Sequence, residues 1–208
     1  VTSIAINGAP TILASVDTIC NSGTTTLNVT NQVSGALYQW QISTDNGSTW
    51  ANISGANSPS YTSLTLTDTT YFRVYVTCGS ATADTSAPKG IIVNVPTISG
   101  TTGATICGAN NATISATGVG TFNWYATAGS TTSLATGSSV TLFTSVTTTY
   151  WVEASIGTCL SASGRQPVTV TVNPSTPVIA EATDSSLCLG QSTVLSASSA
   201  DAGYAYTW

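Results

Sequence analysis

The chain has 208 residues, of which 41% are hydrophobic and only 5% are charged, and its formal net charge is -5. It contains three basic residues and no histidine. Nucleic acids and anionic membranes attract clustered Lys or Arg, so this composition argues against both as partners. Without histidine, a Ser-His-Asp triad is excluded within this chain. No apolar run approaches the length needed to span a bilayer, so we expect no membrane insertion.

A pattern of cysteines and aromatic residues occurs in two complete copies and one partial copy. Each copy starts with a cysteine, reaches an aromatic residue two positions before a Trp, continues to Thr-Thr-Tyr and closes with a second cysteine. The landmarks are Cys20, Tyr38, Trp40, Tyr71 and Cys78 in the first copy, Cys107, Phe122, Trp124, Tyr150 and Cys159 in the second, and Cys188, Tyr206 and Trp208 in the third. A period of about 80 residues predicts an array of similar small domains.

Val, Thr, Ile and Tyr alternate with small polar residues in short runs, which is typical of β-strands. In chain order, we predict strands at 24–30, 36–43, 70–77, 89–95 and 167–173. Gly, Asn, Ser and Pro separate these runs, as hairpin turns require. No stretch keeps a helical apolar period. We therefore predict an all-β fold of tandem immunoglobulin-like β-sandwiches, with about seven strands per domain, in an extended array.

The repeat also predicts the domain boundaries. Residues 1–7 match 167–173 in pattern, so we interpret 1–7 as the last strand of a preceding immunoglobulin-like domain. Complete domains are expected at 8–95 and 96–173, and 174–208 is interpreted as the start of a further, incomplete domain. The linkers between them are short and contain proline, which favours a stiff, extended rod.

Cysteines in phase with the repeat, in a chain with few charges, predict a disulfide framework and an extracellular location. We predict pairing within each copy, Cys20 with Cys78 and Cys107 with Cys159, which leaves Cys188 unpaired in this sequence. However, the first cysteine of each copy precedes the second sandwich strand, and the second cysteine ends a later strand. These places can lie at opposite ends of a sandwich, whereas a disulfide needs Cα atoms within about 7 Å. A bridge between neighbouring domains, Cys20 to Cys159, is therefore the alternative.

The segment 43–50 has the sequence S-T-D-N-G-S-T-W, which looks like the Asp box of sialidase-type propellers. Its physics is that of a hairpin turn, because Asn46 and Gly47 tolerate positive φ and the Asp45 carboxylate can accept bonds from nearby amides. We interpret the segment as such a turn. A sugar-stacking role for Trp50 is the alternative.

The tryptophans fall into two groups. Trp40, Trp124 and Trp208 recur at the same phase, which predicts core packing between the sheets. Trp50 and Trp151 do not recur in phase, so we consider them candidates for exposed aromatic contacts.

The acidic residues are scattered along the chain and form no closely spaced pair of the kind that glycosidases use. No calcium loop occurs, and with no CxxC pair and no histidine the cysteines do not form a zinc pattern. We therefore predict no enzymatic activity, no cofactor and no metal site.

The second copy resembles a known group of repeats. It contains CGANNATISATG from Cys107, FNWYA from Phe122, TTTYWVEA ending at Ala154 and RQPVTVTV from Arg165. These segments resemble the bacterial immunoglobulin-like repeats found in large secreted proteins of the Bacteroidota, and the resemblance covers nearly the whole chain. It implies proteins exported by the type IX route that act as adhesins, gliding-motility filaments or spacers in modular enzymes.

The resemblance also implies O-glycosylation at Asp followed by Ser or Thr, which makes Thr18 and Thr69 candidate sites. Our functional hypothesis is a structural and adhesive segment of an extracellular bacterial surface protein that forms a fibre or stalk. Its partners would be neighbouring copies or adjacent domains, with glycans or surfaces as further partners. The alternative is a carbohydrate-binding or spacer module of a secreted polysaccharide-degrading enzyme, which an exposed aromatic platform would favour.

Overall fold

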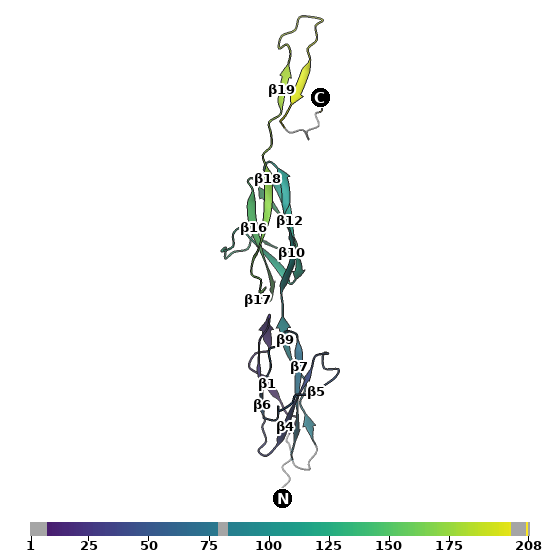
Figure 1. The fold of residues 1–208 in the computed structure, drawn as a ribbon, viewed down its shortest axis with the longest axis vertical. Helices are drawn as coiled ribbons and strands as arrows, with labels where there is room; N and C mark the ends of the chain where they lie inside the picture. The colour runs from purple at the N-terminus through teal and green to yellow at the C-terminus, as the bar shows by residue number, and fades with distance from the viewer. Residues whose placement is uncertain (1–7, 79–82, 201–206, 208) are drawn as a thin grey trace.

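The structure is a computed structural model that describes residues 8–78, 83–200 and 207. Two β-sandwiches and a β-hairpin follow one another along the long axis of the molecule (Figure 1). Every regular element among the described residues is a strand. These residues therefore contain no helix that could cross a membrane.

The first domain contains two facing sheets. Its strands are β1 (Ile12–Ala14), β2 (Thr18–Cys20), β3 (Thr26–Val29), β4 (Leu37–Ser43), β5 (Ala51–Asn52), β6 (Ser60–Thr62), β7 (Thr70–Thr77), β8 (Asp84–Thr85) and β9 (Lys89–Asn94). One sheet has the order β1-β3-β6, and the other has the order β2-β9-β7-β4-β5 with β8 paired to β7. Strand β2 runs parallel to β9, whereas the other pairs are antiparallel.

The second domain repeats this arrangement strand for strand. Its strands are β10 (Thr97–Thr102), β11 (Ala104–Cys107), β12 (Asn110–Val119), β13 (Thr121–Tyr125), β14 (Ala135–Thr136), β15 (Ser139–Thr144), β16 (Thr148–Ile156), β17 (Cys159–Leu160) and β18 (Gln166–Asn173). The sheet orders are β10-β12-β15 and β11-β18-β16-β13-β14, with β17 on β16. Strand β11 again runs parallel to the last strand, β18.

The two cores follow from alternation along the strands. In β7, Phe72, Val74 and Val76 point inward at every second position and are at most 2% exposed. They pack with Trp40 of β4, which is 0% exposed. Period-two burial of β-branched and aromatic side chains is what holds one face of each sheet against the other.

The second core uses the same plan with smaller residues. Trp124 is 0% exposed and packs among Val152, Ala154 and Val170. In both domains the central indole N–H donates to a backbone carbonyl, from Trp40 to Ser58 at 2.9 Å and from Trp124 to Gly137 at 2.8 Å. The predicted core role of these two tryptophans is confirmed.

A hairpin of β19 (Ile179–Ala182) and β20 (Leu195–Ser198) follows the second domain. Its strands pair antiparallel, as β1 pairs with β3 in the first domain. Unlike β3, whose Leu27 and Val29 are at most 2% exposed, the hairpin exposes its apolar side chains: Ile179 is 53% and Leu195 is 57% exposed. The hairpin thus has the first pairing of a sandwich, and within residues 174–200 the structure describes no second sheet.

The predicted fold class, an all-β chain of immunoglobulin-like sandwiches, is confirmed. The predicted strands correspond to β3, β4, β7, β9 and β18. Each domain has nine strands in place of the expected seven, because the first strand is divided between the two sheets and short strands extend the edges. The segment 1–7 and Trp208, predicted as a strand and a core residue, lie outside the described residues.

The two Thr-Thr-Tyr segments are not in the same register. Val74 and Val152 are equivalent, because each pairs with the core Trp of its own domain. Tyr71 lies three residues before Val74 and is half-buried. Tyr150 lies two residues before Val152 and is buried. Phe72 therefore takes the core position in the first domain that Tyr150 takes in the second. The shared Thr-Thr-Tyr sequence therefore does not mark equivalent positions. Which residue points inward is set by the alternation of buried and exposed side chains along each strand.

Candidate functional site: the bridged junction

The first cysteine of the first domain lies at the end where the chain leaves that domain. Strand β2 runs parallel to β9 and ends at Cys20, which is opposite Asn94 in the register. Asn94 is the last residue of β9, and β10 of the next domain begins at Thr97. Cys20 is exposed there, beside the junction.

The second cysteine lies at the other end. Strand β7 runs antiparallel to β9, with Thr70 opposite Ile91, so β7 begins near the junction and leads away from it. At about 3.3 Å per residue, the eight-residue strand carries Cys78 roughly 25 Å from its start. A disulfide tolerates a Cα separation of no more than about 7 Å. The predicted Cys20–Cys78 pairing is therefore wrong, because sandwich topology places the two residues at opposite ends.

The same topology operates in the second domain. Cys107 ends β11 opposite Asn173 at the far end of that sandwich. Cys159 lies in β17, just after the turn that ends β16, and pairs with Ile156 at the end facing the first domain. The predicted Cys107–Cys159 pairing is therefore wrong for the same reason.

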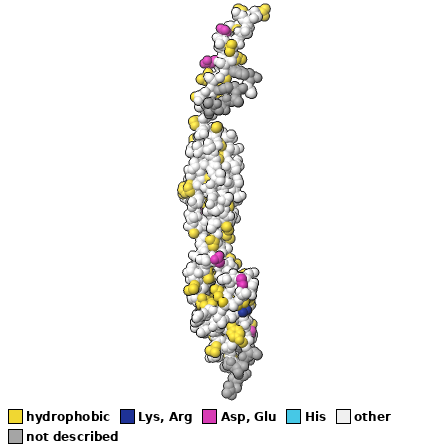
Figure 2. All heavy atoms as spheres, turned by 45° about the vertical axis from the view of Figure 1, so that its right-hand side comes forward, with side chains coloured by type: hydrophobic (Ala, Val, Ile, Leu, Met, Phe, Trp, Pro, Cys, Tyr) yellow, Lys and Arg dark blue, Asp and Glu magenta, His cyan; other side chains and the backbone are white. Residues whose placement is uncertain are grey.

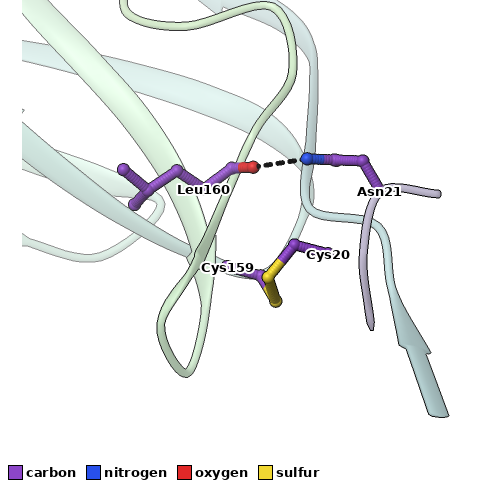
Figure 3. The surroundings of a disulfide bond; sticks show 4 residues. All are labelled: Cys20, Asn21, Cys159 and Leu160. Atoms are coloured by element: carbon purple, nitrogen blue, oxygen red, sulfur yellow. Dashed lines mark hydrogen bonds between the residues drawn. A yellow bond between two sulfur atoms is a disulfide. The ribbon is translucent and has the colours of Figure 1, made fainter. Parts of the chain in front are cut away.

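The structure instead contains the interdomain bridge that was the alternative. Cys20 and Cys159 form a disulfide with a Cα separation of 5.1 Å across 139 residues of sequence. Next to it, the Asn21 side-chain amide donates to the Leu160 carbonyl at 3.0 Å (Figure 3). Cys78, Cys107 and Cys188 are free thiols in this structure.

Local backbone geometry prepares the junction for this contact. Asn21 has a φ of 62°, a left-handed conformation that Asn tolerates better than most residues. In that conformation its N–H donates to the Asn94 carbonyl at 2.8 Å, which fixes Cys20 against the last strand. Asn21 was not among the predicted site residues. An Asn directly after a strand-ending cysteine was the available signal.

The junction thus has two covalent connections side by side. One is the peptide linker of Val95 and Pro96, in which the Pro96 ring is buried. The other is the disulfide, with Cys159 only 2% exposed. Closing a loop of this length lowers the entropy of the unfolded chain by an amount worth about 5 kcal/mol on the chain-entropy model. While the disulfide is intact, the two domains are joined at a second point besides the linker.

The Asp-box segment is a hairpin loop, as we interpreted it. The Asp45 carboxylate accepts bonds from the Thr49 amide at 2.9 Å, the Thr49 hydroxyl at 2.5 Å and the Ser43 hydroxyl at 2.7 Å. Asn46 and Gly47 have φ of 58° and 82°. The bonds from Thr49, then that from Ser43, lower the pKa of Asp45 to about 2. The carboxylate therefore holds the turn together through these hydrogen bonds, which is a structural role.

The two candidate contact tryptophans are both partly buried. The Trp50 indole donates to the Gly47 carbonyl at 3.0 Å, and the Arg73 guanidinium lies 4.3 Å from its ring centroid. One ring face of Trp50 is therefore occupied by the protein itself. Trp151 lies in β16 between Tyr125 of β13 and Pro167 of β18.

The two candidate glycosylation residues differ in their surroundings. Thr18 is exposed in β2. Thr69 is partly buried, and its hydroxyl accepts a bond from the Val93 amide at 3.2 Å. Thr147 does the same for Val172 in the second domain, at 3.0 Å. Because Thr69 has this repeated structural role, Thr18 is the more accessible candidate of the two.

All three cationic side chains have a partner. Arg73 donates to Gln41 at 2.6 Å, Lys89 forms an ion pair with Asp17 at 2.9 Å, and Arg165 lies 3.6 Å from Glu153. Glu153 and Arg165 are the charged residues of 96–173, so the surface of the second domain is close to neutral, as the mostly white central body in Figure 2 shows. Within the part of the chain that the structure describes, no group of three His, Cys, Asp or Glu side chains could hold a metal ion.

Comparison with known families gives two matches. Residues 94–174 match the family described as "Ig-like domain CHU_C associated", and residues 9–95 match "Domain of unknown function (DUF8696)". Each match covers less than half of the chain. No curated protein matches the sequence. The topology and the family matches together define this chain as a tandem of immunoglobulin-like domains.

Solved structures with similar folds include murine CEACAM1b, at 14% identity and a TM-score of 0.46, over 79% of this chain and 100% of that one. A marsupial T cell receptor is similar at 12% identity and a TM-score of 0.43, over 83% and 78% of the two chains. Extracellular domains 3–5 of Drosophila OTK are similar at 11% identity and a TM-score of 0.29, over 81% and 65%. Likenesses this distant say nothing about function.

Proposed function

We propose that this chain is a stiff structural segment of an extracellular bacterial surface protein, in which immunoglobulin-like domains form a fibre or stalk that presents an adhesive surface at a distance. The observation that carries the proposal is the Cys20–Cys159 disulfide between consecutive domains. A bridge inside a domain would stabilise that domain alone. A bridge between domains fixes the orientation of one domain relative to the other. Such a constraint serves a function that depends on this orientation, such as holding a surface at a set distance.

The stiffness argument follows from the two connections at the junction. A single short linker would let the second domain pivot about Val95 and Pro96. The disulfide and the Asn21–Leu160 hydrogen bond add fixed points on strands β2 and β17. Rotation then requires breaking or distorting these contacts, so the pair of domains behaves as one rod. A rigid array can hold a binding surface at a fixed distance, whereas domains joined by flexible linkers cannot.

The bridge also protects the domains from tension. When the ends are pulled, force enters at β2, crosses the disulfide and leaves from β17. The chain between the two cysteines, whose sequence separation is 139, lies in parallel with this covalent path and includes most of the cores of both domains. These residues cannot be extended while the disulfide is intact. A surface fibre under shear would therefore keep its length even if a domain lost its fold.

An extracellular location is part of the proposal, because a structural disulfide persists in oxidising compartments and is rare in the reducing cytosol. Two small sandwiches with limited cores also benefit from covalent support there. The match of residues 94–174 to an immunoglobulin-like family is consistent with such a module.

Single-molecule pulling tests the proposal. With handles outside residues 20 and 159, we expect unfolding of the oxidised chain to release only short segments. Addition of reductant, or Cys20→Ser, should release about 490 Å of further contour length from 139 residues at about 3.5 Å each. Cys188→Ser serves as the control and should behave like the unchanged chain. Equal release with and without reductant would contradict a mechanical role for the bridge.

A further inference from the structure

Cys107 occupies the same place in the second domain that Cys20 occupies in the first. Each ends the strand that runs parallel to the last strand of its domain, with Cys20 opposite Asn94 and Cys107 opposite Asn173. In both domains these partner residues end the last strand, immediately before the chain passes to the next module.

The backbone just after the two cysteines is also the same. Asn21 has a φ of 62° and Gly108 has a φ of 61°. Each of these residues donates its N–H to the carbonyl of the last strand residue, Asn94 or Asn173, at 2.8 Å. Cys107 is exposed, as Cys20 is, and carries a free thiol. Thus the backbone arrangement that presents Cys20 is already formed around Cys107, whereas the side-chain amide of Asn21 has no counterpart at Gly108.

The partner cannot come from the second domain itself. Cys159 is already bonded, and β17 lies at the opposite end of the sandwich from Cys107. The linker that follows passes close to Cys107, since a Cβ on Gly108 would lie 3.6 Å from Ser175. Beyond the linker, β19 and β20 pair as β1 and β3 do. The chain beyond this end therefore opens with the strand pairing that opens a sandwich, after a linker between Asn173 and Ile179 that is longer than the one between Asn94 and Thr97.

We propose that Cys107 forms a second interdomain disulfide with a cysteine in the hairpin equivalent to β16–β17 of the immunoglobulin-like domain that β19 and β20 begin. This proposal rests on the proposed function as a domain array and states its connection rule: the parallel edge strand of one domain is joined to the late hairpin of the next. Because Cys107 lies between Cys20 and Cys159 in sequence, successive bridges interleave. The covalent path then continues from domain to domain without a gap.

The chemistry is oxidation of two thiols. Cys107 and its partner lose two protons and two electrons as the S–S bond forms. A thiol–disulfide oxidoreductase of the exporting compartment accepts them through exchange, and its own disulfide becomes a dithiol. The Cys20–Cys159 bridge requires the same oxidant, so no additional chemistry is introduced.

Disulfide mapping of the natural full-length chain tests the rule directly. We expect mass spectrometry of non-reduced peptides to find Cys20 joined to Cys159, and Cys107 joined to a cysteine that follows residue 208. Recovery of Cys107 as an alkylated thiol, or joined to Cys78 or Cys188, would overturn the proposal.

A second measurement uses a chain in which residues 8–173 are followed by another copy of 95–173, so that the new junction repeats the linker of the first. After oxidation by glutathione disulfide, we expect Cys107 of the middle domain to join Cys159 of the added domain, with the loss of two alkylatable thiols. Cys107→Ser should restore one of those thiols and leave the Cys20–Cys159 bridge intact. Full alkylation of Cys107 in the middle domain, in a chain that keeps the Cys20–Cys159 bridge, would contradict the rule.

Small-angle scattering of the same chain separates the two proposals. A straight three-domain rod with Cys107 free would overturn only the second bridge. A bridged but strongly bent or compact chain would contradict the proposed rod function and leave the connection rule standing.

Discussion

The two sandwiches have the same strand order but are built from different residues. The first core combines Trp40 with Phe72 and Leu27, whereas the second combines Trp124 with three buried alanines. The first domain carries the Asp45 loop and two of the three basic residues, and the second has a nearly neutral surface. What they share is the central Trp, the parallel edge strand and the cysteine at its end. The comparison teaches that the central Trp anchors each core and that the parallel edge strand with its cysteine lies at each junction, whereas the other core residues and the loops differ.

The strongest way to break this comparison is to remove the bridge that joins the two domains. For Cys20→Ser, we expect the free energy of unfolding to fall by about 4–5 kcal/mol, because the unfolded chain regains loop entropy. Denaturant titration, followed by tryptophan fluorescence, measures this loss. Cys188→Ser should leave the free energy of unfolding unchanged. An unaltered midpoint in the Cys20 variant would mean that the bridge carries no stability.

Removing the shared Trp from either core should affect only that domain. Trp40→Ala and Trp124→Ala each leave a cavity at a fully buried site, and we expect each to cost about 4 kcal/mol. Limited proteolysis with peptide identification should find cleavage first in the altered domain. Leu13→Ala, at a side chain that is 61% exposed, is the matched control. Cleavage spread equally over both domains would show that they do not fold as separate units.

A glycine of the second domain sharpens the comparison. Gly118 in β12 has a φ of 147°, and a Cβ there would lie 2.0 Å from the Thr97 carbonyl oxygen in β10. We expect Gly118→Ala to cost about 2–3 kcal/mol through strain and a shifted strand, with the loss confined to the second domain. Gly129→Ala, where a Cβ meets no atom within 4 Å, should be nearly silent in thermal unfolding. Equal melting of the two variants would contradict the close strand approach.

The smallest effect is expected from the loop that only the first domain has. Asp45→Asn removes charged acceptors from Thr49 and Ser43, and the Tm should fall by no more than about 5 °C. Because folding lowers the pKa of Asp45 to about 2, its contribution is complete above the unfolded pKa of about 4 and is lost as the pH falls toward 2. Melting curves between pH 5 and 2 should therefore converge for the two proteins, whereas Asp184→Asn should follow the unchanged chain. A difference in Tm between the two proteins that persists at pH 2 would contradict an origin in the charge of the Asp45 carboxylate.

Much of the fold could be predicted from local sequence. The strands β4 and β7 follow from alternation of apolar and polar residues, and the core positions of Trp40 and Trp124 follow from their recurrence in phase. The hairpin at Asp45 follows from the residues that tolerate positive φ. Each of these features depends on neighbours within a few residues, so the information is contained in the segment itself. Tyr71 and Tyr150 show the limit, since a matching motif shifted by one residue in a strand points to the other face.

The sequence by itself predicted that the cysteines form disulfides, and it left open whether their partners lie within or between domains. Only the tertiary structure decided between these choices. Parallel pairing of β2 with β9 places Cys20 at the end of one sandwich, and the β16–β17 hairpin places Cys159 at the adjoining end of the next. A disulfide depends on two Cα atoms meeting within a few ångströms, and that meeting is set by how whole domains are stacked and by no local pattern.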